Sequence, residues 1–214
     1  MVKLYIAEIS ALPDPKEAPW TMRLLSPERQ KRVLQYGKPG DRKRCLGAGL
    51  LLRKVLPLYG VNVEEIRTSS DGKPIVKGIG FNVSHSENMV ACAVGEGPVG
   101  CDVEKITEAP DGIAAHFFHP NEVRYLKTCE KQASDRTFFR IWTMKESYIK
   151  MTGEGLKLPL DRFEVRPENG EARILRGNRL LTCGITEYRI MDYLAAVCAN
   201  EPRSRTVTFL ESLL

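Results

Sequence analysis

Two acidic residues with one residue between them, Asp102 and Glu104, lie in a short apolar segment. If residues 99–104 form a strand, side chains alternate, so the apolar residues face one side and both carboxylates face the other, beside Gly100. Carboxylates roughly 6–7 Å apart at Cα repel each other unless a cation lies between them. Oxygen ligands without a nearby His or Cys pair favour Mg²⁺ or Mn²⁺ over zinc. An Asp-x-Glu pair alone is more often a solvated edge strand, so a metal site here needs support from other residues.

A second pattern places an acid, a base and an aromatic residue on one side of a predicted helix. Trp142, Glu146 and Lys150 recur every four residues, so on a helix they lie together. They flank an apolar stripe that would face the core. The stripe consists of Ile141, Met144, Tyr148 and Met151. A Glu–Lys pair at this spacing is usually surface support, but beside a large aromatic side chain it is also a candidate for a site that faces a cleft.

Hydrogen-bond donors gather at a third position. Ser84-His-Ser86 ends a predicted strand and offers hydroxyl and imidazole groups suited to a phosphate. Gly72-Lys-Pro74 lies shortly before it. His116 and His119 have an i, i+3 spacing that metal ligands can have, but no cysteine or third histidine is suitably placed. We therefore discount a zinc site.

Positive charge is concentrated near the N-terminus. The chain has a net charge of +5, and eight Lys/Arg residues lie between Arg23 and Arg44 against two acids, Glu28 and Asp41. This excess indicates an anionic partner, although a solvated helical face is the simpler explanation. A nucleic-acid-binding protein is a further alternative. It would interleave aromatic and basic residues, and Tyr36 is the single aromatic residue in the segment.

The elements that must position these residues can be outlined from the pattern. Ser26-Pro-Glu28 is typical of a helix start, with an N-cap, a proline and an early acid. That helix should end near Tyr36, and Asp41 should cap a second one that continues to about Val55. Further helices are predicted at about 121–129 and 135–151. Strands are predicted at 1–9, 82–83, 89–94, 99–103, 163–165, 180–188 and 193–198. Helices and antiparallel hairpins mixed in blocks indicate an α+β fold.

Composition excludes several classes of protein. Hydrophobic residues make up 43% and charged residues 28% of the 214 residues, a balance typical of globular domains. No apolar run approaches the roughly 20 residues that cross a bilayer, and the start lacks the pattern of a signal peptide. The six cysteines contain no C-x-x-C pair, and several lie among Val and Ala as reduced thiols would. We expect a cytoplasmic protein without a membrane or nucleic-acid partner.

Taken together, five blocks in a fixed order resemble the phosphopantetheinyl transferases of the surfactin-synthetase-activating (Sfp) type. They cover roughly residues 72–156, and the basic segment 26–44 resembles the N-terminal lobe of that family. The blocks are Gly72-Lys-Pro74, Phe81-Asn-x-Ser-His-Ser86, Gly100-x-Asp-Val-Glu104, Phe118-x-x-x-Glu122 and Trp142-Thr-x-Lys-Glu-Ser-Tyr-x-Lys-x-x-Gly-x-Gly-Leu156.

The resemblance implies a fold and a division of the chain. The length is similar to that of the two-lobed members, not of the half-length trimeric synthases. We therefore expect a monomer with two similar α/β lobes related by pseudo-twofold symmetry. The N-terminal lobe, residues 1–103, would bind the phosphate and adenine of coenzyme A. The C-terminal lobe, residues 104–214, would carry the metal and the catalytic helix, with the active site in the cleft between the lobes.

The resemblance also implies a reaction and its catalytic residues. A serine hydroxyl of an acyl or peptidyl carrier protein attacks the β-phosphate of coenzyme A and releases 3′,5′-ADP. Asp102, Glu104 and Glu146 would hold Mg²⁺, with Mn²⁺ as an alternative. Glu146 would also be the general base on the serine, and Lys150 would stabilise the charge on the phosphate.

Coenzyme A would contact the remaining residues that resemble the family. Arg29, Arg32 and Arg44, together with His85, would surround the ribose 3′-phosphate. The adenine pocket and its surroundings would be lined by Gly72, Lys73, Pro74 and Ser84, and Lys150 would contact the coenzyme as well as take part in catalysis.

The carrier protein is expected to dock beside residues 109–126, which follow the metal-binding strand. Phe118 belongs to a family block and should lie in the core. Ile113 and Phe117 would then remain at the surface near the reacting phosphate. Burial of all three residues is the alternative.

Three other functions remain as alternatives. A magnesium-dependent phosphohydrolase acting on a coenzyme A-like nucleotide would use the same carboxylates without a protein acceptor. A basic nucleic-acid-binding protein would bind DNA or RNA with a steep salt dependence. A non-catalytic coenzyme A-binding module would have no need of the three carboxylates.

Overall fold

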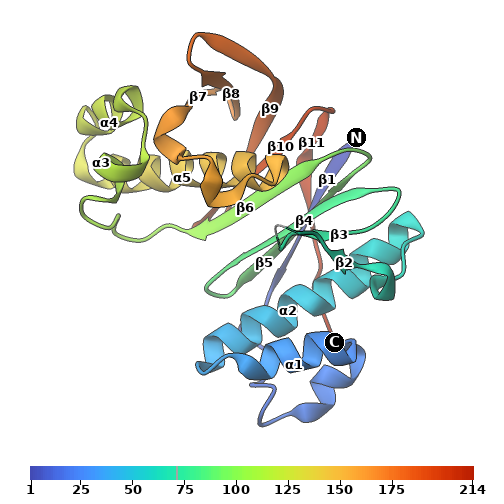
Figure 1. Cartoon of the computed structure of the whole chain (residues 1–214). Helices are drawn as coiled ribbons and strands as arrows, with labels where there is room; N and C mark the ends of the chain where they lie inside the picture. The colour runs from blue at the N-terminus through green and yellow to red at the C-terminus, as the bar shows by residue number, and fades with distance from the viewer. Residues whose placement is uncertain (71) are drawn as a thin grey trace.

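Two sheets and a short hairpin form the framework of the computed structural model, which describes residues 1–70 and 72–214 (Figure 1). The first sheet has the strand order β11-β1-β5-β4, and the second has the order β6-β10-β9-β8-β7. In the first sheet, β11 runs parallel to β1 and the other neighbours are antiparallel. The strands are β1 (Val2–Glu8), β2 (Arg67–Thr68), β3 (Pro74–Ile75), β4 (Gly80–Ser86), β5 (Met89–Gly95), β6 (Val99–Lys105), β7 (Glu164–Glu168), β8 (Glu171–Arg176), β9 (Arg179–Ile190), β10 (Tyr193–Ala199) and β11 (Arg203–Phe209).

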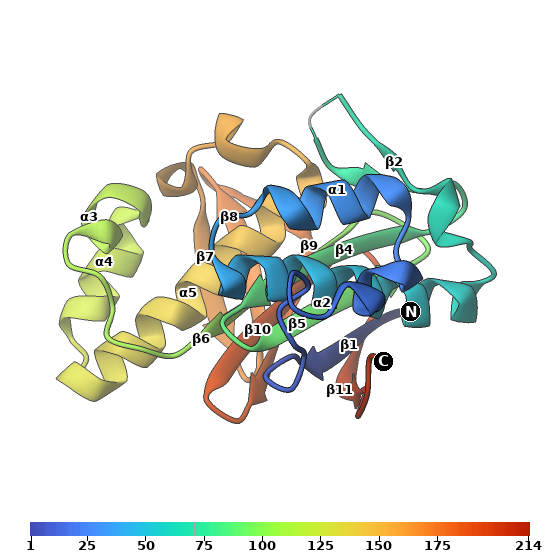
Figure 2. The same cartoon turned by 90° about the horizontal axis from the view of Figure 1, so that it is seen from below.

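Helices cover one face of each sheet. Both views show α1 beside α2 on the first sheet and α5 along the second (Figures 1 and 2). The α-helices are α1 (Pro27–Gln35), α2 (Pro39–Val55), α3 (Ile113–Phe117), α4 (Pro120–Lys127) and α5 (Lys131–Thr152). The 3₁₀ turns are η1 (Pro19–Leu24), η2 (Leu56–Tyr59), η3 (Val63–Glu65), η4 (Gly155–Lys157) and η5 (Leu160–Arg162). None of the helices in the described part of the chain has the length and apolar character that crossing a bilayer requires.

The two lobes repeat one topology. In the first lobe, β1 pairs with β5 and β5 with β4; in the second, β6 pairs with β10 and β10 with β9. In each lobe a long helix, α2 or α5, follows the first of these strands in the chain. The α+β fold with two similar lobes is therefore confirmed, although the sequence itself shows no visible repeat.

The lobes are interlocked in the chain. β6 begins at Val99 and pairs along its whole length with β10, so it belongs to the second sheet although it includes the predicted boundary at residue 103. β11, from the C-terminal part of the chain, pairs with β1 and belongs to the first sheet. A core of buried apolar and tyrosine side chains from β1, β5, β6, β9 and β10 fills the space between the sheets.

Local sequence explains where the first two helices begin. The Ser26 hydroxyl accepts a hydrogen bond from the Arg29 amide at 3.3 Å, which confirms the predicted N-cap of α1. The prediction that Asp41 caps α2 was wrong, because the helix already begins at Pro39. Proline is favoured at the first helical position, where its fixed φ suits the helix and no amide donor is needed. Asp41 instead lies in the first turn and pairs with Arg44.

Candidate active site

The two sheets meet where β4 lies against β6, and polar side chains join them. Along β4, Ser84 donates to Asp102 Oδ1 at 2.7 Å and Ser86 donates to Glu104 Oε2 at 2.7 Å. The Asn82 side chain accepts a hydrogen bond from the backbone amide of Cys101 at 2.9 Å. The two serines, alternate residues of β4, therefore match the two carboxylates, alternate residues of β6. The predicted pair of carboxylates faces hydroxyl groups of the opposite lobe.

Helix α5 brings Lys150 to the carboxylate of Asp102. Lys150 Nζ lies 2.6 Å from Asp102 Oδ1 and 3.0 Å from Ser84 Oγ. Burial opposes the charge of Lys150, but the charge of Asp102 and its hydrogen bond outweigh burial and raise the pKa of Lys150. Lys150 is therefore held as a cation on one oxygen of a buried carboxylate.

A glycine allows this approach of helix and strand. A Cβ atom at Gly100 would lie 2.0 Å from the Ser147 carbonyl oxygen and 2.3 Å from the Met151 amide nitrogen, so β6 and the backbone of α5 are in direct contact there. The predicted apolar face of β6 is confirmed in the core between the sheets. Because α5 covers the other face, Asp102 is also buried, with an exposed fraction of 3%.

The carboxyl groups of Asp102, Glu104 and Glu146 share this region, where their negative charges repel one another. Burial, followed by the charge of Asp102, raises the pKa of Glu104 to about 7. Burial and the charge of Asp102 likewise raise the pKa of Glu146, which is half-buried on α5. Asp102 Oδ2 is buried without a hydrogen-bond partner among the described residues. An unpaired oxygen among crowded carboxyl groups fits a hard cation such as Mg²⁺ or Mn²⁺.

The three groups do not form a closed coordination shell. Within residues 1–70 and 72–214, no three His, Cys, Asp or Glu side chains are gathered closely enough to hold one ion. Lys150 supplies the positive charge beside Asp102. The fit to a divalent cation thus rests on the oxygen chemistry and on the unpaired Oδ2 of Asp102.

Basic residues of the first lobe border an open groove of about 680 Å³. Arg29, Arg32 and Pro74 line it, together with residues of α1, α2 and the segment 63–68. The Arg29 side chain lies across α2 and donates to the Cys45 carbonyl oxygen at 3.3 Å. Its Nε is buried and finds no partner in the described part of the chain, and burial lowers the pKa of Arg29. A buried, incompletely paired guanidinium beside a groove is suited to an anionic ligand.

Cations of both lobes converge on His85. His85 lies on the exposed side of β4, yet partial desolvation lowers the pKa of its imidazole. The positive charges of Arg44, Lys150 and Arg29 lower it further. Arg44 is half-buried and also donates to the Glu87 carbonyl oxygen at 3.5 Å. Arg29 therefore lines the groove and also adds to the positive charge that lowers the pKa of His85.

Gly72 and Lys73 are placed differently from Pro74. Neither lines the groove. Gly72 has a φ of +80°, which glycine adopts without strain. The ammonium group of Lys73 points to backbone carbonyls of the second lobe, the nearest being that of Lys150 at 2.5 Å.

Comparison with known proteins gives the family. A model of the 4′-phosphopantetheinyl transferase superfamily matches residues 98–198, and a model of the 4′-phosphopantetheinyl transferase N-terminal region matches residues 12–96. The 4′-phosphopantetheinyl transferase Sfp of Bacillus subtilis (strain 168) is 35% identical over 189 residues, which cover 85% of this chain and 84% of Sfp. This chain belongs to the 4′-phosphopantetheinyl transferase family.

A second relative agrees with this assignment, and one solved structure is weakly similar to part of the chain. The 4′-phosphopantetheinyl transferase gsp of Aneurinibacillus migulanus is 34% identical over 82% of this transferase and 76% of its own length. A solved holo-[acyl-carrier-protein] synthase of Thermotoga maritima is 18% identical with a TM-score of 0.40, and the match covers 47% of the transferase and 61% of the synthase. The two family models meet between β5 and β6, where the sheets of the transferase also divide.

The predicted docking residues lie on α3, next to helix α5. Phe118 is buried and stacks on Phe138 with ring centroids 5.1 Å apart, as expected for a core residue. Phe117 is 40% exposed and its ring meets Trp142 edge to face at 6.1 Å. Ile113 is half-buried against the second core. An exposed aromatic side chain therefore borders α5 on this side.

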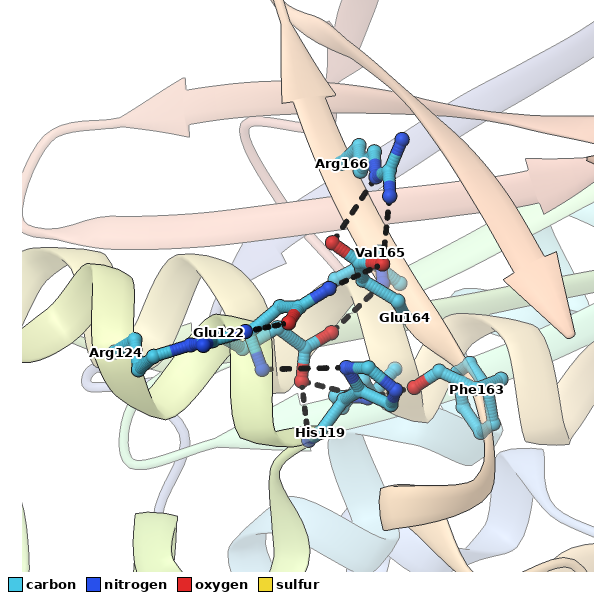
Figure 3. Close-up of polar contacts among 9 residues, drawn as sticks. His119, Glu122, Arg124, Phe163, Glu164, Val165 and Arg166 are labelled. Carbon is cyan, nitrogen blue, oxygen red and sulfur yellow. Dashed lines mark hydrogen bonds and ion pairs between the residues drawn. The ribbon is translucent and has the colours of Figure 1, made fainter. Parts of the chain in front are cut away.

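Sequence reasoning missed a buried ion pair behind the site. Lys145 Nζ lies 2.9 Å from Glu122 Oε2, and the exposed fractions of the two side chains are 0% and 3%. Figure 3 shows Glu122 bonded to the backbone of His119 and Val165, at 2.8 Å and 2.7 Å. Burial raises the pKa of Glu122 and lowers that of Lys145. The available signal was the family block that ends at Glu122, together with a lysine within the apolar side of α5.

Proposed function

We propose that this enzyme transfers the 4′-phosphopantetheine group of coenzyme A to a serine of an acyl or peptidyl carrier protein, with Mg²⁺ as the preferred metal and Mn²⁺ as an alternative. One observation carries the proposal: a lysine–aspartate pair with an unpaired carboxylate oxygen lies where the two lobes meet. A groove of the first lobe that is lined by arginines supports it. Transfer of a charged group between two substrates requires this combination of cations and carboxylates.

Asp102, Glu104 and Glu146 would hold the metal. When bound, a divalent cation would neutralise charge on the pyrophosphate of coenzyme A. Ser84 and Ser86 orient Asp102 and Glu104 from the opposite strand. Such hydrogen bonds fix a ligand's direction, so these serines would have a supporting role in the site.

Glu146 and Lys150 would perform the proton transfer and the charge stabilisation. The serine oxygen of the carrier forms a bond to the β-phosphorus, and the bond from that phosphorus to the bridging oxygen breaks. The electron pair leaves with 3′,5′-ADP, and the serine proton goes to the Glu146 carboxylate. A pKa raised by burial makes Glu146 a better base than a solvated glutamate. Lys150, kept positive by Asp102, would stabilise the charge on the transferring phosphate.

The coenzyme would extend from this site into the groove. Arg29 and Arg32 line the groove and would contact the ribose 3′-phosphate, with Arg44 and His85 nearby. Pro74 would support the adenine. Within the described residues the guanidinium of Arg29 donates to the Cys45 carbonyl from one of its nitrogens, which leaves other donors for a phosphate in the groove.

The carrier protein would dock on α3. Phe117 and Ile113 would supply apolar contacts beside Trp142. The net charge of +5 would speed the encounter with an acidic carrier. Kinetics of Phe117→Ala and Ile113→Asp with varied carrier test this placement, with circular dichroism as the folding control. We expect a higher KM for the carrier; folded variants with an unchanged carrier KM would contradict it.

Intact-mass measurement of an apo carrier incubated with the enzyme, coenzyme A and Mg²⁺ tests the reaction itself. We expect the carrier mass to increase by one phosphopantetheine group, and a carrier with its serine replaced by alanine to remain unmodified. Release of phosphate or phosphopantetheine without a change in carrier mass would favour a phosphohydrolase. Salt-sensitive binding of random RNA or DNA without transfer would favour a nucleic-acid-binding protein.

A further inference from the structure

The side chain of Lys73 crosses from one lobe to the other. Its Nζ lies 2.5 Å from the Lys150 carbonyl oxygen, 3.4 Å from that of Met151 and 3.4 Å from that of Val99. Lys150 and Met151 are in the last turn of α5, and Val99 is the first residue of β6. One ammonium group therefore binds the ends of the two elements that carry Lys150 and Asp102.

The carbonyls that Lys73 binds are ones that a helix leaves without internal partners. The last four carbonyls of an α-helix lack intrahelical donors, and the C-terminus carries partial negative charge. In α5 the amide of Gly153 bonds to the Ile149 carbonyl. The two carbonyls that follow it receive the cation of Lys73. Lys73 thus completes the C-terminal cap of the catalytic helix from outside that helix.

The contact lies where β6 and α5 touch. Gly100, which follows Val99, is the residue whose Cβ would strike the backbone at Ser147 and Met151. Any shift of α5 along β6 would move Lys150 relative to Asp102, because their contact depends on this close approach. Lys73 bonds to both elements at this point and opposes such a shift.

The other end of Lys73 is fixed on the hairpin that borders the groove. The Lys73 amide donates to Ser69 Oγ at 3.1 Å, and the Ser69 amide donates to the Lys73 carbonyl oxygen at 2.9 Å. The next residue, Pro74, lines the groove proposed for the nucleotide. The hairpin therefore connects the groove to the end of the catalytic helix through a single side chain.

We propose that Lys73 is a positioning residue that holds Lys150 beside Asp102 through the carbonyls of α5 and β6. On this proposal the Lys73 ammonium group does not bind the nucleotide. The inference rests on the proposed role of Lys150. It predicts that loss of the Lys73 ammonium lowers kcat while KM for coenzyme A changes little. A residue that contacts the adenine would show the opposite pattern.

Steady-state kinetics of Lys73→Met test this split, with Lys77→Met, an exposed lysine of the same region, as the matched control. We expect kcat to fall at least about tenfold, since small misplacements of a catalytic group have effects of this size, with KM for coenzyme A within about twofold. Lys73→Arg, which keeps a cation at the carbonyls, should recover part of kcat. If Lys73→Met does not fold, Lys73→Gln, which keeps one donor, should show the same split.

Combination with Lys150→Ala separates the two hypotheses. If Lys73 acts through Lys150, adding Lys73→Met to Lys150→Ala should cause little further loss. A full additional loss, or a raised KM for coenzyme A with unchanged kcat, would overturn the positioning role. Lys150→Ala alone must lower kcat; if it does not, the proposed role of Lys150 fails, which is a different result from failure at Lys73.

Discussion

The carboxylate of Asp102 has two oxygens in unlike surroundings. Oδ1 receives Lys150 at 2.6 Å and Ser84 at 2.7 Å, while Oδ2 is buried without a partner in residues that the structure describes. An unpaired buried oxygen costs roughly 1–3 kcal/mol or more when charged. This arrangement suits a cation on one side and a lysine on the other, so on the proposed mechanism Asp102 would link metal binding to the position of Lys150.

Asp102→Asn removes the charge while keeping the shape of the side chain. We expect phosphopantetheine transfer to fall at least about 10²-fold, as when one electrostatic group is lost from an active site. We also expect Mg²⁺ to raise the thermal stability of the wild type, and this increase should disappear in the variant. Thermal unfolding with and without Mg²⁺ measures the second effect independently of activity. Asp111→Asn, at an exposed position, is the control. If Mg²⁺ still raises the thermal stability of Asp102→Asn, Asp102 is not a ligand of the metal.

Arg29 depends on a glycine of the neighbouring helix. A Cβ at Gly49 would lie 2.8 Å from Leu25 Cδ2 and 3.3 Å from Arg29 Nε. Arg29→Ala should raise KM for coenzyme A roughly tenfold or more, because a charged hydrogen bond is worth about 1.5–3 kcal/mol. Gly49→Ala should also raise KM for coenzyme A, because the added methyl group would displace the Arg29 guanidinium.

The comparison with 3′-dephospho-coenzyme A decides whether Arg29 reads the 3′-phosphate. Both variants should change KM for the dephospho compound much less than KM for coenzyme A. Arg23→Ala, an exposed arginine that does not line the groove, should change neither. Equal changes for both ligands would assign Arg29 to another part of the coenzyme.

At the scale of elements, α5 shows what sequence can and cannot predict. The apolar stripe predicted from the spacing is confirmed, since Ile141, Met144, Tyr148 and Met151 are all buried. The complete burial of Lys145 was not predicted, because its partner Glu122 comes from another helix and its other acceptors are carbonyls at residues 160 and 163. Periodicity identifies the faces of one helix; it carries no information about the elements that cover them.

The Lys145–Glu122 pair should be costly to break and cheaper to replace. Lys145→Met leaves a buried glutamate unpaired, and we expect the free energy of unfolding to fall by about 3–5 kcal/mol. Lys145→Met combined with Glu122→Gln should lose less than the single variant, because no buried charge remains. Urea unfolding measures both, with Lys131→Met, an 85% exposed position of the same helix, as control. A double variant less stable than Lys145→Met would contradict this account.

The turn between α1 and α2 depends on a second ion pair. Arg42 is 5% exposed and donates from Nε to Asp14 Oδ1 at 2.8 Å and from Nη2 to Asp14 Oδ2. Its Nη1 donates to the carbonyls of Tyr36 and Gly37. The hydrogen bonds from Arg42 lower the pKa of Asp14 to about 2. An unfolded aspartate titrates at about pH 3.9. The Asp14–Arg42 pair therefore stabilises the fold above that pH, and this stabilisation is lost as the pH falls toward 2.

Asp14→Asn tests this pH dependence. The wild type should be more stable than the variant at pH 7, and the difference in free energy of unfolding should shrink as pH falls from about 4 to about 2. Urea unfolding of both proteins across this range gives the difference directly. A difference that stays constant with pH would mean that the Asp14 carboxylate does not pair with Arg42 in solution.

The whole molecule is a repeat whose halves share a core, and most of this sharing was not visible in the sequence. Two similar lobes were predicted from the family resemblance, and the matching strand orders of the structure agree with that prediction. The return of β11 to the first sheet was not predicted, because parallel pairing of β11 with β1 joins segments about 200 residues apart. The serines of β4 were predicted as phosphate donors, yet their hydroxyls bond to the carboxylates of β6.

These shared contacts predict that the two lobes unfold together. Fully buried side chains of β1, β5, β6 and β10 lie in one core, and β11 ties the C-terminal part of the chain to the first sheet. The two tryptophans provide one reporter in each lobe, Trp20 before α1 and Trp142 on α5. Trp20→Phe and Trp142→Phe each leave one tryptophan as the fluorescence reporter. Circular dichroism of each variant measures the effect of the substitution on stability. After correction for that effect, urea unfolding followed by fluorescence should give the same slope and the same midpoint for both variants. If one tryptophan reports unfolding at a lower urea concentration than circular dichroism of the same variant, the lobes unfold separately. The junction that holds Asp102 beside Lys150 would then open before the rest of the molecule unfolds.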